Sequence, residues 1–404
     1  MPAERPLRVT HVTTVPASLI FLRGQTAYMR ERGVELSFVS SPGPELDEFG
    51  AAEGAPVRGV PMERRITPLK DLVALARLYR HFRETEPDIV HAHTPKGGLL
   101  GTIAATLARV PRRIYHMRGL PLMGATGAKR VLLTITERVS CTLATDVLCV
   151  SHSLREKAIE LRLVRADRIT VLGAGSGQGV DTDRFDPARF TPEDRAAIRA
   201  RIGVPADALV YGFVGRIVRD KGIHELAEAW AQVRGQLPHA YLVVVGPFEE
   251  GDPIDPAVKR ALEADERVRL LGPRKDTPPL YAAMDVVVLP SYREGFPNVP
   301  LEAASMERPV IVTRVAGCID AVEHEVTGLV VEPRSSASLA RAMERYATSA
   351  ELRLEHGRRG RARVQREFRR ERLWSGLLDI YARRTAPSRR LERARLPRLE
   401  EGHG

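Results

Sequence analysis

The chain has 404 residues, which at about 150 residues per domain indicates two or three domains. Hydrophobic residues make up 43% and charged residues 28%, a composition typical of globular proteins and outside the range of disordered ones. The three cysteines, Cys141, Cys149 and Cys318, form no C-x-x-C pair, which argues against a disulfide framework and a zinc site. No apolar run reaches the about 18 residues that a membrane span needs. We therefore expect a soluble protein of a reducing compartment.

The net charge of +11 is distributed unevenly along the chain. Residues 1–190 carry 27 basic and 20 acidic side chains, residues 191–352 carry 19 and 24, and residues 353–398 carry 16 arginines and five acids. Such asymmetry indicates contact with something anionic, although 55 arginines against seven lysines is also a skew that a GC-rich genome produces. The sequence contains no zinc finger, recognition helix or aromatic RNA-binding pattern, so nucleic acid is not an expected partner.

Short runs rich in Val, Leu and Ile alternate with amphipathic stretches of helix length along most of the chain. The expected strands cover residues 8–12, 35–40, 88–91, 113–116, 146–150 and 168–172 in the first half, and 210–215, 241–246, 268–271, 286–289, 310–313 and 329–331 in the second. Alternation of strand and helix is typical of doubly wound parallel sheets. The sequence therefore predicts an α/β fold with two Rossmann-like lobes that face each other across a cleft.

Two helices follow from the same pattern. Residues 70–86 read as a helix whose packed face carries Leu72, Leu75, Ala76, Tyr79 and Phe82. The last long helix covers about residues 361–383 and ends before Pro387. The short apolar segment 12–22 follows a strand-like run and lacks a cleavage site, so we interpret it as structure rather than a signal peptide.

Residues 183–195 interrupt the pattern with Asp-Pro and Thr-Pro pairs, which places a domain boundary there. We expect a first domain over residues 1–187, a second over 188–365, a connecting helix over 366–385 and a basic, mobile tail over 386–404.

Two short segments resemble a nucleotide-binding motif and a metal site, but we assign neither function to them. The run Gly173–Gly179 has the spacing G-x-G-x-G-x-G, not that of a dinucleotide fingerprint, and we interpret it as a bend between the lobes. Asp181 and Asp183 resemble a metal-binding pair but have no further ligands nearby in the sequence. We expect no P-loop, no metal and no cofactor.

The informative segment is LPSYREGFPNVPLEA, residues 289–303. A buried strand leads into a loop and then into a helix near Val299, and ligands of open α/β sheets bind at such carboxyl ends. Free backbone N–H groups after Gly295 can hold an anion there. Glu302, one turn into the helix, can accept hydrogen bonds from both hydroxyls of a ribose, and Glu294 can reach the other end of the same ligand.

A second strand-to-helix segment supplies positive charge. In FVGRIVRDKG, residues 213–222, Gly215 is followed by Arg216 and, five positions later, by Lys221. A guanidinium binds phosphate bidentately, and an ammonium adds a compact charge beside it. The pair is what a departing nucleoside diphosphate needs to stabilise the charge that develops on its β-phosphate.

The spacings Glu294-x7-Glu302 and Gly215-Arg216-x4-Lys221 resemble those of glycosyltransferase family 4, retaining enzymes of GT-B fold, over residues 5–385. The resemblance implies that Arg216 and Lys221 bind the donor diphosphate without a metal ion, and that Glu302 binds the ribose. It implies that Glu294 contacts the transferred sugar and phosphates, together with Gly295, Phe296, Pro297 and Asn298. It also implies that the final helix returns to the first lobe. Arg274 and Lys275 are expected near the base.

The first half departs from the common family pattern. Residues 15–24 lack the usual glycine-rich turn, and Arg118 stands where many members have a histidine, with His116 two residues away. Both departures, and residues 90–98 and 150–153, resemble a bacterial subgroup that builds surface polysaccharides on polyprenyl diphosphate. His93, Lys96 and Arg118 are thus candidate acceptor contacts. A purely structural role for each of these residues remains an alternative.

The resemblance implies transfer of a hexose or N-acetylhexosamine from a nucleotide sugar, UDP-linked, to a sugar on polyprenyl diphosphate. The basic first lobe, with the apolar loop Leu120–Met123, suits an anionic membrane surface, which places the protein at the inner face of the cytoplasmic membrane. Three alternatives remain: a soluble small-molecule acceptor, a GT-B nucleotide-sugar epimerase, and a basic binding protein without catalytic activity.

Overall fold

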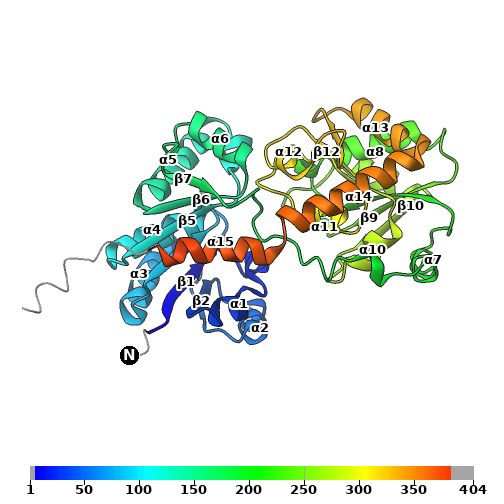
Figure 1. Cartoon of the computed structure of the whole chain (residues 1–404). Helices are drawn as coiled ribbons and strands as arrows, with labels where there is room; N and C mark the ends of the chain where they lie inside the picture. The colour runs from blue at the N-terminus through cyan, green and yellow to red at the C-terminus, as the bar shows by residue number, and fades with distance from the viewer. Residues whose placement is uncertain (1–4, 250, 384–404) are drawn as a thin grey trace, which may run out of the picture. The chain divides into compact units, whose positions relative to one another are not determined.

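The computed structural model describes residues 5–249 and 251–383, which form two α/β units and contain two sheets (Figure 1). The first unit comprises the chain up to Met117, residues 131–148 and the chain from Trp374, and the second comprises residues 118–130 and 149–373. The boundary at residue 187 stays a prediction. The tail 386–404 lies outside the described residues, and so does its predicted mobility.

The first sheet has seven strands in the order β3-β2-β1-β4-β5-β6-β7. Its strands are β1 (Leu7–Val12), β2 (Val34–Ser40), β3 (Val57–Gly59), β4 (Ile89–His93), β5 (Arg112–Met117), β6 (Asp146–Cys149) and β7 (Ile169–Val171). The predicted strands are confirmed, and only β3 was not expected, because three residues show no period. The chain order reverses between β1 and β4, which lie side by side and parallel.

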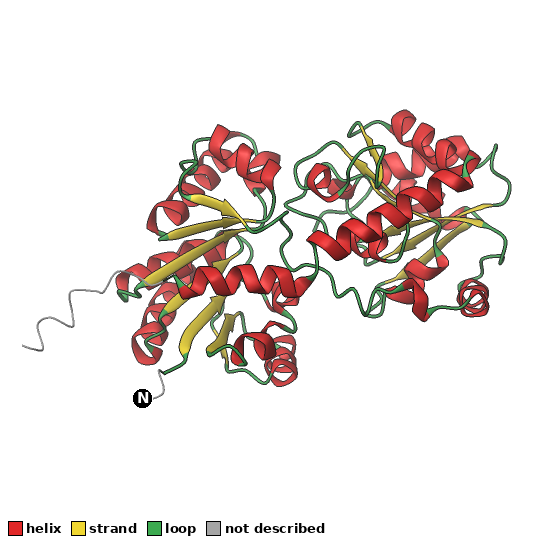
Figure 2. Cartoon of the chain, in the orientation of Figure 1, coloured by secondary structure: helices red, strands yellow, loops and turns green. Residues whose placement is uncertain are grey.

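Helices cover the faces of this sheet (Figure 2). Along the first half of the chain they are η1 (Pro16–Leu22), α1 (Gln25–Arg30), α2 (Pro44–Glu53), α3 (Pro68–Thr85), α4 (Pro95–Leu107), η2 (Pro121–Gly124), α5 (Gly127–Leu143) and α6 (His152–Glu160). Helices α3 and α4 share one buried apolar cluster with β1, β2 and β4, in which Val90 and Ala92 point toward Leu78 and Ala104.

The predicted packed face of α3 is confirmed for Leu75 and Phe82 and wrong for Leu72, Ala76 and Tyr79. The side chains that pack are Ala74, Leu78 and Phe82, whereas Leu72 is 62% exposed and Tyr79 is also exposed. Of the predicted face only Phe82 is fully buried. The helix is apolar on more than one side, so its period alone does not determine which side packs. Close contact with α4 selects the side that carries alanine and leucine at intervals of four.

The last long helix is also not continuous as predicted. The structure has α14 (Ala350–Glu367) and α15 (Arg370–Ala382), separated at Phe368. The reason is a backbone pairing: the amide of Val180 donates to the carbonyl of Phe368 at 2.8 Å, and the amide of Arg370 donates to the carbonyl of Val180 at 3.2 Å. These bonds replace the helical bonds that a continuous helix would make.

Helix α15 packs on the first sheet, on the face opposite α3 and α4. His91 alternates with Val90 and Ala92 along β4, and its Nδ1 lies 2.6 Å from the hydroxyl of Tyr381. Arg112 on β5 donates to the carbonyls of Tyr381 and Arg383 and pairs with Asp146 at 2.9 Å. The buried guanidinium of Arg112 therefore binds the last carbonyls of α15, which have no partner within the helix.

The second sheet has six strands in the order β10-β9-β8-β11-β12-β13. The strands are β8 (Leu209–Val214), β9 (Ala240–Val245), β10 (Val268–Gly272), β11 (Val286–Leu289), β12 (Val310–Thr313) and β13 (Gly328–Val331), all within one residue of the predicted bounds. The helices here are η3 (Pro187–Arg189), α7 (Pro192–Arg201), η4 (Arg219–Lys221), α8 (Ile223–Val233), α9 (Pro256–Ala264), α10 (Pro278–Ala283), α11 (Val299–Ser305), α12 (Cys318–Ala321) and α13 (Ser336–Thr348). The strands are buried on both faces, as their continuous apolar runs predicted.

We expect Arg112→Ala to lower the free energy of unfolding of the first unit by about 3 kcal/mol, because Asp146 and the carbonyls at the end of α15 would lose a buried partner. Circular dichroism during urea denaturation measures the change. Arg165→Ala is the matched control: its pair with Asp167 is largely exposed and should cost less than about 1 kcal/mol. Equal effects of the two substitutions would contradict this assignment.

Candidate functional site

The candidate site lies where the strand order of the second sheet reverses. Strand β8 is followed along the chain by β9 and β10 on one side, and β11 by β12 and β13 on the other, while β8 and β11 pair directly. Loops that leave the carboxyl ends of two such strands diverge and leave space for a ligand. The predicted residues Gly215, Arg216 and Lys221 follow β8, and residues 294–298 follow β11.

The first of these loops places a guanidinium near the loop after β9. Gly246 has positive φ, and a Cβ there would overlap the carbonyl oxygen of Gly215, so the close approach of the two loops requires glycine. Nη1 of Arg216 lies 2.6 Å from Oε2 of Glu249, and the Arg216 side chain is 52% exposed. The guanidinium is therefore available to an anion that replaces Glu249.

Lys221 and Glu294 join the two loops. Lys221 ends the short helix η4, and its ammonium forms an ion pair with Oε1 of Glu294, which also accepts a hydrogen bond from Ser291 at 2.7 Å. Both partners are largely buried, with 19% and 12% of their side chains exposed. Gly222 adopts positive φ, and a Cβ there would overlap the carbonyl oxygen of Pro290. The two segments predicted from separate motifs thus form one site.

The loop after Glu294 is packed too closely for larger residues. A Cβ on Gly295 would overlap the carbonyl oxygen of Arg118, and Phe296 packs against Phe368 with ring centroids 5.6 Å apart. Pro297 is buried, and α11 begins after Asn298 as predicted. The side-chain amide nitrogen of Asn298, Nδ2, is buried and has no hydrogen-bond partner among the described residues. An unpaired buried donor is costly, so this position fits a ligand acceptor.

Glu302 lies in the first turn of α11 with one oxygen already bonded. The hydroxyl of Tyr281 donates to its Oε2 at 2.8 Å, which leaves Oε1 for another donor. Burial raises the pKa of Glu302, although Tyr281 and Arg184 favour the ionised form. Arg184 in turn pairs with Asp276 at 3.1 Å, next to Lys275 in the loop after β10. Contact of Arg274 and Lys275 with a base stays a prediction.

Three candidate acceptor residues lie in different surroundings. Arg118 donates to the carbonyl of Gly177 at 2.8 Å in the second unit.

His93 belongs to a cluster of buried histidines. It is only 1% exposed, and its Nε2 lies 2.8 Å from Nδ1 of His11. His11, His91 and His93 offer ligand atoms within 4.8 Å of one another, the only such group of three among the described residues. His116 also belongs to this buried set and lies 3.2 Å from His91. The predictions of no metal and of acceptor contact at His93 and Arg118 therefore stay untested.

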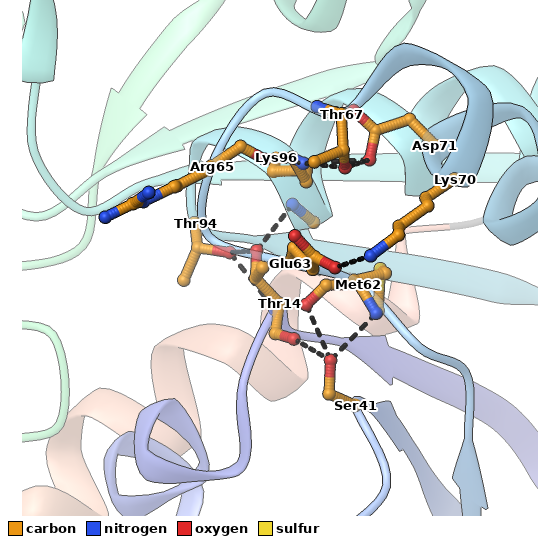
Figure 3. A network of polar contacts seen from close by, with 11 residues as sticks. Thr14, Ser41, Met62, Glu63, Arg65, Thr67, Lys70, Asp71, Thr94 and Lys96 are labelled. Atoms are coloured by element: carbon orange, nitrogen blue, oxygen red, sulfur yellow. Dashed lines mark hydrogen bonds and ion pairs between the residues drawn. The ribbon is translucent and has the colours of Figure 1, made fainter.

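Lys96 is part of a polar network at the carboxyl ends of β1 and β4 (Figure 3). Its ammonium pairs with Asp71 at 2.8 Å and donates to the backbone carbonyl of Arg65. Nearby, the hydroxyls of Thr14 and Thr94 are 2.7 Å apart. The contacts of Lys96 fix the loop before α3, and its contact with an acceptor stays a prediction.

Sequence reasoning missed three residues of the site. Glu249, Tyr281 and Ser291 bind Arg216, Glu302 and Glu294 respectively. Ser291 stands three residues before Glu294 in the same loop, so the motif itself could have indicated it. Glu249 and Tyr281 come from other elements, and no sequence spacing connects them with their partners.

The raised pKa of Glu302 gives a prediction for the ligand-free protein. A buried acid whose pKa is raised by folding costs stability above its unfolded value of 4.5, and the cost grows as pH rises through the folded pKa. We therefore expect Glu302→Gln to raise the melting temperature at pH 7.5 and to have no such effect near pH 4. Differential scanning calorimetry across this pH range measures both.

Glu228→Gln serves as the matched control, because Glu228 is an exposed acid on α8 of the same unit. Its melting temperature should follow wild type at every pH. A Glu302→Gln protein that melts at or below the wild-type temperature at pH 7.5 would contradict the prediction. It would show that hydrogen bonds and charges around Glu302 offset the cost of burying its carboxylate.

Comparisons with known proteins identify the family of the chain. Residues 208–349 match the family described as "Glycosyl transferases group 1", and residues 20–175 match "Glycosyl transferase 4-like domain". A capsular polysaccharide biosynthesis glycosyltransferase, CapM of Staphylococcus aureus, is 35% identical over 93% of this chain and 96% of its own length. An Escherichia coli enzyme named UDP-Gal:alpha-D-GlcNAc-diphosphoundecaprenol alpha-1,3-galactosyltransferase is 31% identical over 70% of this chain and 72% of its own.

Solved structures show the same fold. HepE of Anabaena, solved in complex with UDP and glucose, superposes with a TM-score of 0.78 over 93% of this chain and 99% of its own, at 22% identity. WaaG, a glycosyltransferase of lipopolysaccharide biosynthesis, gives a TM-score of 0.71 over 94% of this chain and 100% of its own, at 17% identity. The two parallel-sheet lobes are those of the GT-B fold. The chain therefore belongs to glycosyltransferase family 4 and is a GT-B glycosyltransferase of the bacterial surface-polysaccharide type.

Proposed function

We propose that the protein transfers a hexose or N-acetylhexosamine from a UDP-linked donor to a hydroxyl of a polyprenyl-diphosphate-linked sugar. In this proposal the anomeric configuration is retained and no metal ion takes part. Two similar proteins support this choice of substrates. HepE, a structural neighbour, has been solved with UDP-glucose. The E. coli relative is named for a UDP-sugar donor and a diphosphoundecaprenol-linked acceptor.

The observation that carries the proposal is the presence of two cations in the loop after β8, at the reversal of the second sheet. Arg216 and Lys221 follow the same strand, and each is paired with a carboxylate, Glu249 and Glu294. A diphosphate that enters between the loops takes the place of Glu249 at the exposed guanidinium. Lys221, whose partner lies in the loop after β11, adds its charge to the same phosphates. The two side chains thus do what a divalent cation does in other transferases.

The remaining predicted residues orient the donor. Glu302 presents Oε1 to the ribose, because Tyr281 already occupies Oε2. In the proposal, the side-chain amide of Asn298, which has no partner among the described residues, and the backbone beyond Gly295 bind the phosphates and the sugar. Glu294, held by Lys221 and Ser291, keeps a second oxygen for a hydroxyl of the transferred sugar. This set of contacts fixes the anomeric carbon relative to its leaving group.

Retention follows if the acceptor attacks from the face that the diphosphate leaves. The bond between the anomeric carbon and the β-phosphate oxygen breaks, and a bond to the acceptor oxygen forms on the same side. The acceptor proton passes to the departing phosphate oxygen, whose charge Arg216 and Lys221 stabilise. No carboxylate has to form a covalent intermediate.

The acceptor class places the reaction at a bilayer, because a polyprenyl chain lies in lipid. We therefore propose peripheral attachment at the inner face of the cytoplasmic membrane. Among the helices that the structure describes, none could span a bilayer. The loop expected to contact lipid is not suited to it: Leu120 and Leu122 are buried, and only Met123 is exposed. The correction follows from packing, since η2 folds these side chains inward.

Nucleotide release from a panel of UDP-, GDP- and ADP-sugars, in EDTA and with or without a bacterial lipid extract, tests the proposal. We expect release that depends on lipid and on a UDP-sugar, and a product whose anomeric coupling constant matches the donor. Arg216→Ala should lower turnover by about 100-fold, because the leaving diphosphate loses a charged partner. Arg260→Ala, an exposed arginine on α9, is the matched control and should retain wild-type turnover.

The other outcomes separate the alternatives. Release without any acceptor would indicate an epimerase or a hydrolase, and release that requires a soluble aglycone would indicate a small-molecule acceptor. Activity lost in EDTA and restored by Mg²⁺ would contradict metal independence. Wild-type turnover of the Arg216→Ala protein would contradict the proposed donor site.

A further inference from the structure

Helix α3 carries an exposed apolar surface on the side that does not pack. Leu69 is 81% exposed, Leu72 62% and Val73 52%, and Ile66 in the preceding loop is 51% exposed. Leu69, Leu72 and Val73 are spaced by three and one, which places them on the side opposite the buried Leu78. Four large apolar side chains on adjacent turns form a patch, and patches of this kind mark sites of contact rather than ordinary surface.

The second half of the same outward side is basic. Arg77, Arg80 and Arg83 follow at intervals of three and are all exposed. Within the described chain, the ion pairs around this helix use Lys70 and Asp71, not these three arginines. The helix therefore presents an apolar half and a cationic half to the same side, where three arginines outnumber one exposed carboxylate, Glu84.

The apolar half is held in a fixed position. Asp71 in the first turn of α3 pairs with Lys96 in the first turn of α4, and its two oxygens accept from the amide and hydroxyl of Thr67 (Figure 3). Ser41 bonds both the amide and the carbonyl of Met62 at the other end of the loop. These bonds hold both ends of residues 62–67, and no described segment covers Ile66 or the neighbouring Leu69.

We propose that this surface, residues 66–83 of the first unit, docks on a bilayer that contains anionic phospholipid. The helix lies in the plane of the interface: Ile66, Leu69, Leu72 and Val73 enter the boundary between headgroups and acyl chains, and Arg77, Arg80 and Arg83 bind lipid phosphates. The inference deepens the proposed function, since it assigns the surface by which a lipid-linked acceptor is reached.

Charge distinguishes this partner from a second copy of the chain. A symmetric, antiparallel contact through α3 would place the arginine half of each copy against the apolar half of the other, and burying a charge without a partner is costly. Anionic headgroups instead offer a phosphate to each guanidinium, with the planar geometry that arginine binds well. The combination of apolar anchors and a net positive charge on one helix side thus favours an anionic lipid surface.

Flotation of the full-length protein with vesicles tests the proposal, without donor or acceptor. We expect wild type to bind phosphatidylcholine vesicles with 30% phosphatidylglycerol at least about tenfold more strongly than pure phosphatidylcholine vesicles. The double substitution Leu69→Glu with Leu72→Glu should lower binding by about tenfold or more, because two apolar anchors become anionic. Arg77→Gln, Arg80→Gln and Arg83→Gln together should abolish the preference for anionic lipid.

Leu354→Glu is the matched control, because Leu354 on α14 of the second unit is an equally exposed leucine, at 59%. It should leave vesicle binding unchanged. UDP binding by calorimetry should be unchanged in all of these variants, which separates loss of the docking surface from loss of the donor site. Binding of wild type that ignores lipid charge, or equal loss with Leu354→Glu, would overturn the proposal.

A second measurement uses a fluorophore on a single introduced cysteine, so its result does not depend on whether the glutamate variants fold. The three native cysteines are buried, so Leu72→Cys and Leu354→Cys each offer one accessible thiol for an environment-sensitive fluorophore. Anionic vesicles should shift emission to the blue only at position 72. A shift at neither position would overturn the proposal. So would a wild-type dimer in light scattering that the Leu69→Glu, Leu72→Glu protein no longer forms, since it would assign the surface to a second copy.

Discussion

The ion pair between Lys221 and Glu294 is the interaction on which the candidate site depends. It joins the loop after β8 to the loop after β11, and these strands lie side by side where the sheet reverses its order. Each charge is largely buried, so each relies on the other for stabilisation. Gly222, which allows contact with Pro290, and Ser291, which bonds Glu294, fix the same junction. The candidate site is therefore held in one arrangement by contacts between its own residues.

The two units use the same topology for different chemistry. In the second unit the reversal carries cations and carboxylates with at least one exposed partner, Arg216. In the first unit the reversal between β1 and β4 carries buried histidines, which contact one another and Tyr381, and threonines that bond across the strands. Most of these polar groups of the first unit bond to one another at the sheet edge, and His91 also connects the sheet to α15. This division is consistent with a donor site in one unit and a membrane-facing surface in the other.

Much of the fold could be predicted from the sequence because strands buried on both faces are continuous apolar runs. The errors occur where contacts between distant segments, rather than the local pattern, determine the structure. Helix α3 is apolar on more than one side, so only packing against α4 determines that Leu78 is buried and Leu72 exposed. The break at Phe368 depends on a backbone pairing with Val180, about 190 residues away, which no local period records. At the site, Arg216, Lys221, Glu294 and Glu302 were predicted because diphosphate and ribose require such groups at the ends of strands. Tyr281 and Glu249 were not, since their roles arise only from tertiary contact.

The most direct test compares the binding of UDP and uridine to wild type and to the double variant Lys221→Met, Glu294→Gln. The double substitution removes both charges, so neither is left buried without its partner. If Lys221 binds the diphosphate, isothermal titration calorimetry should show UDP affinity lowered by about 10-fold or more and uridine affinity unchanged. Equal affinity of wild type and variant for UDP, or an equal loss for UDP and uridine, would contradict the assignment of the diphosphate site to this junction.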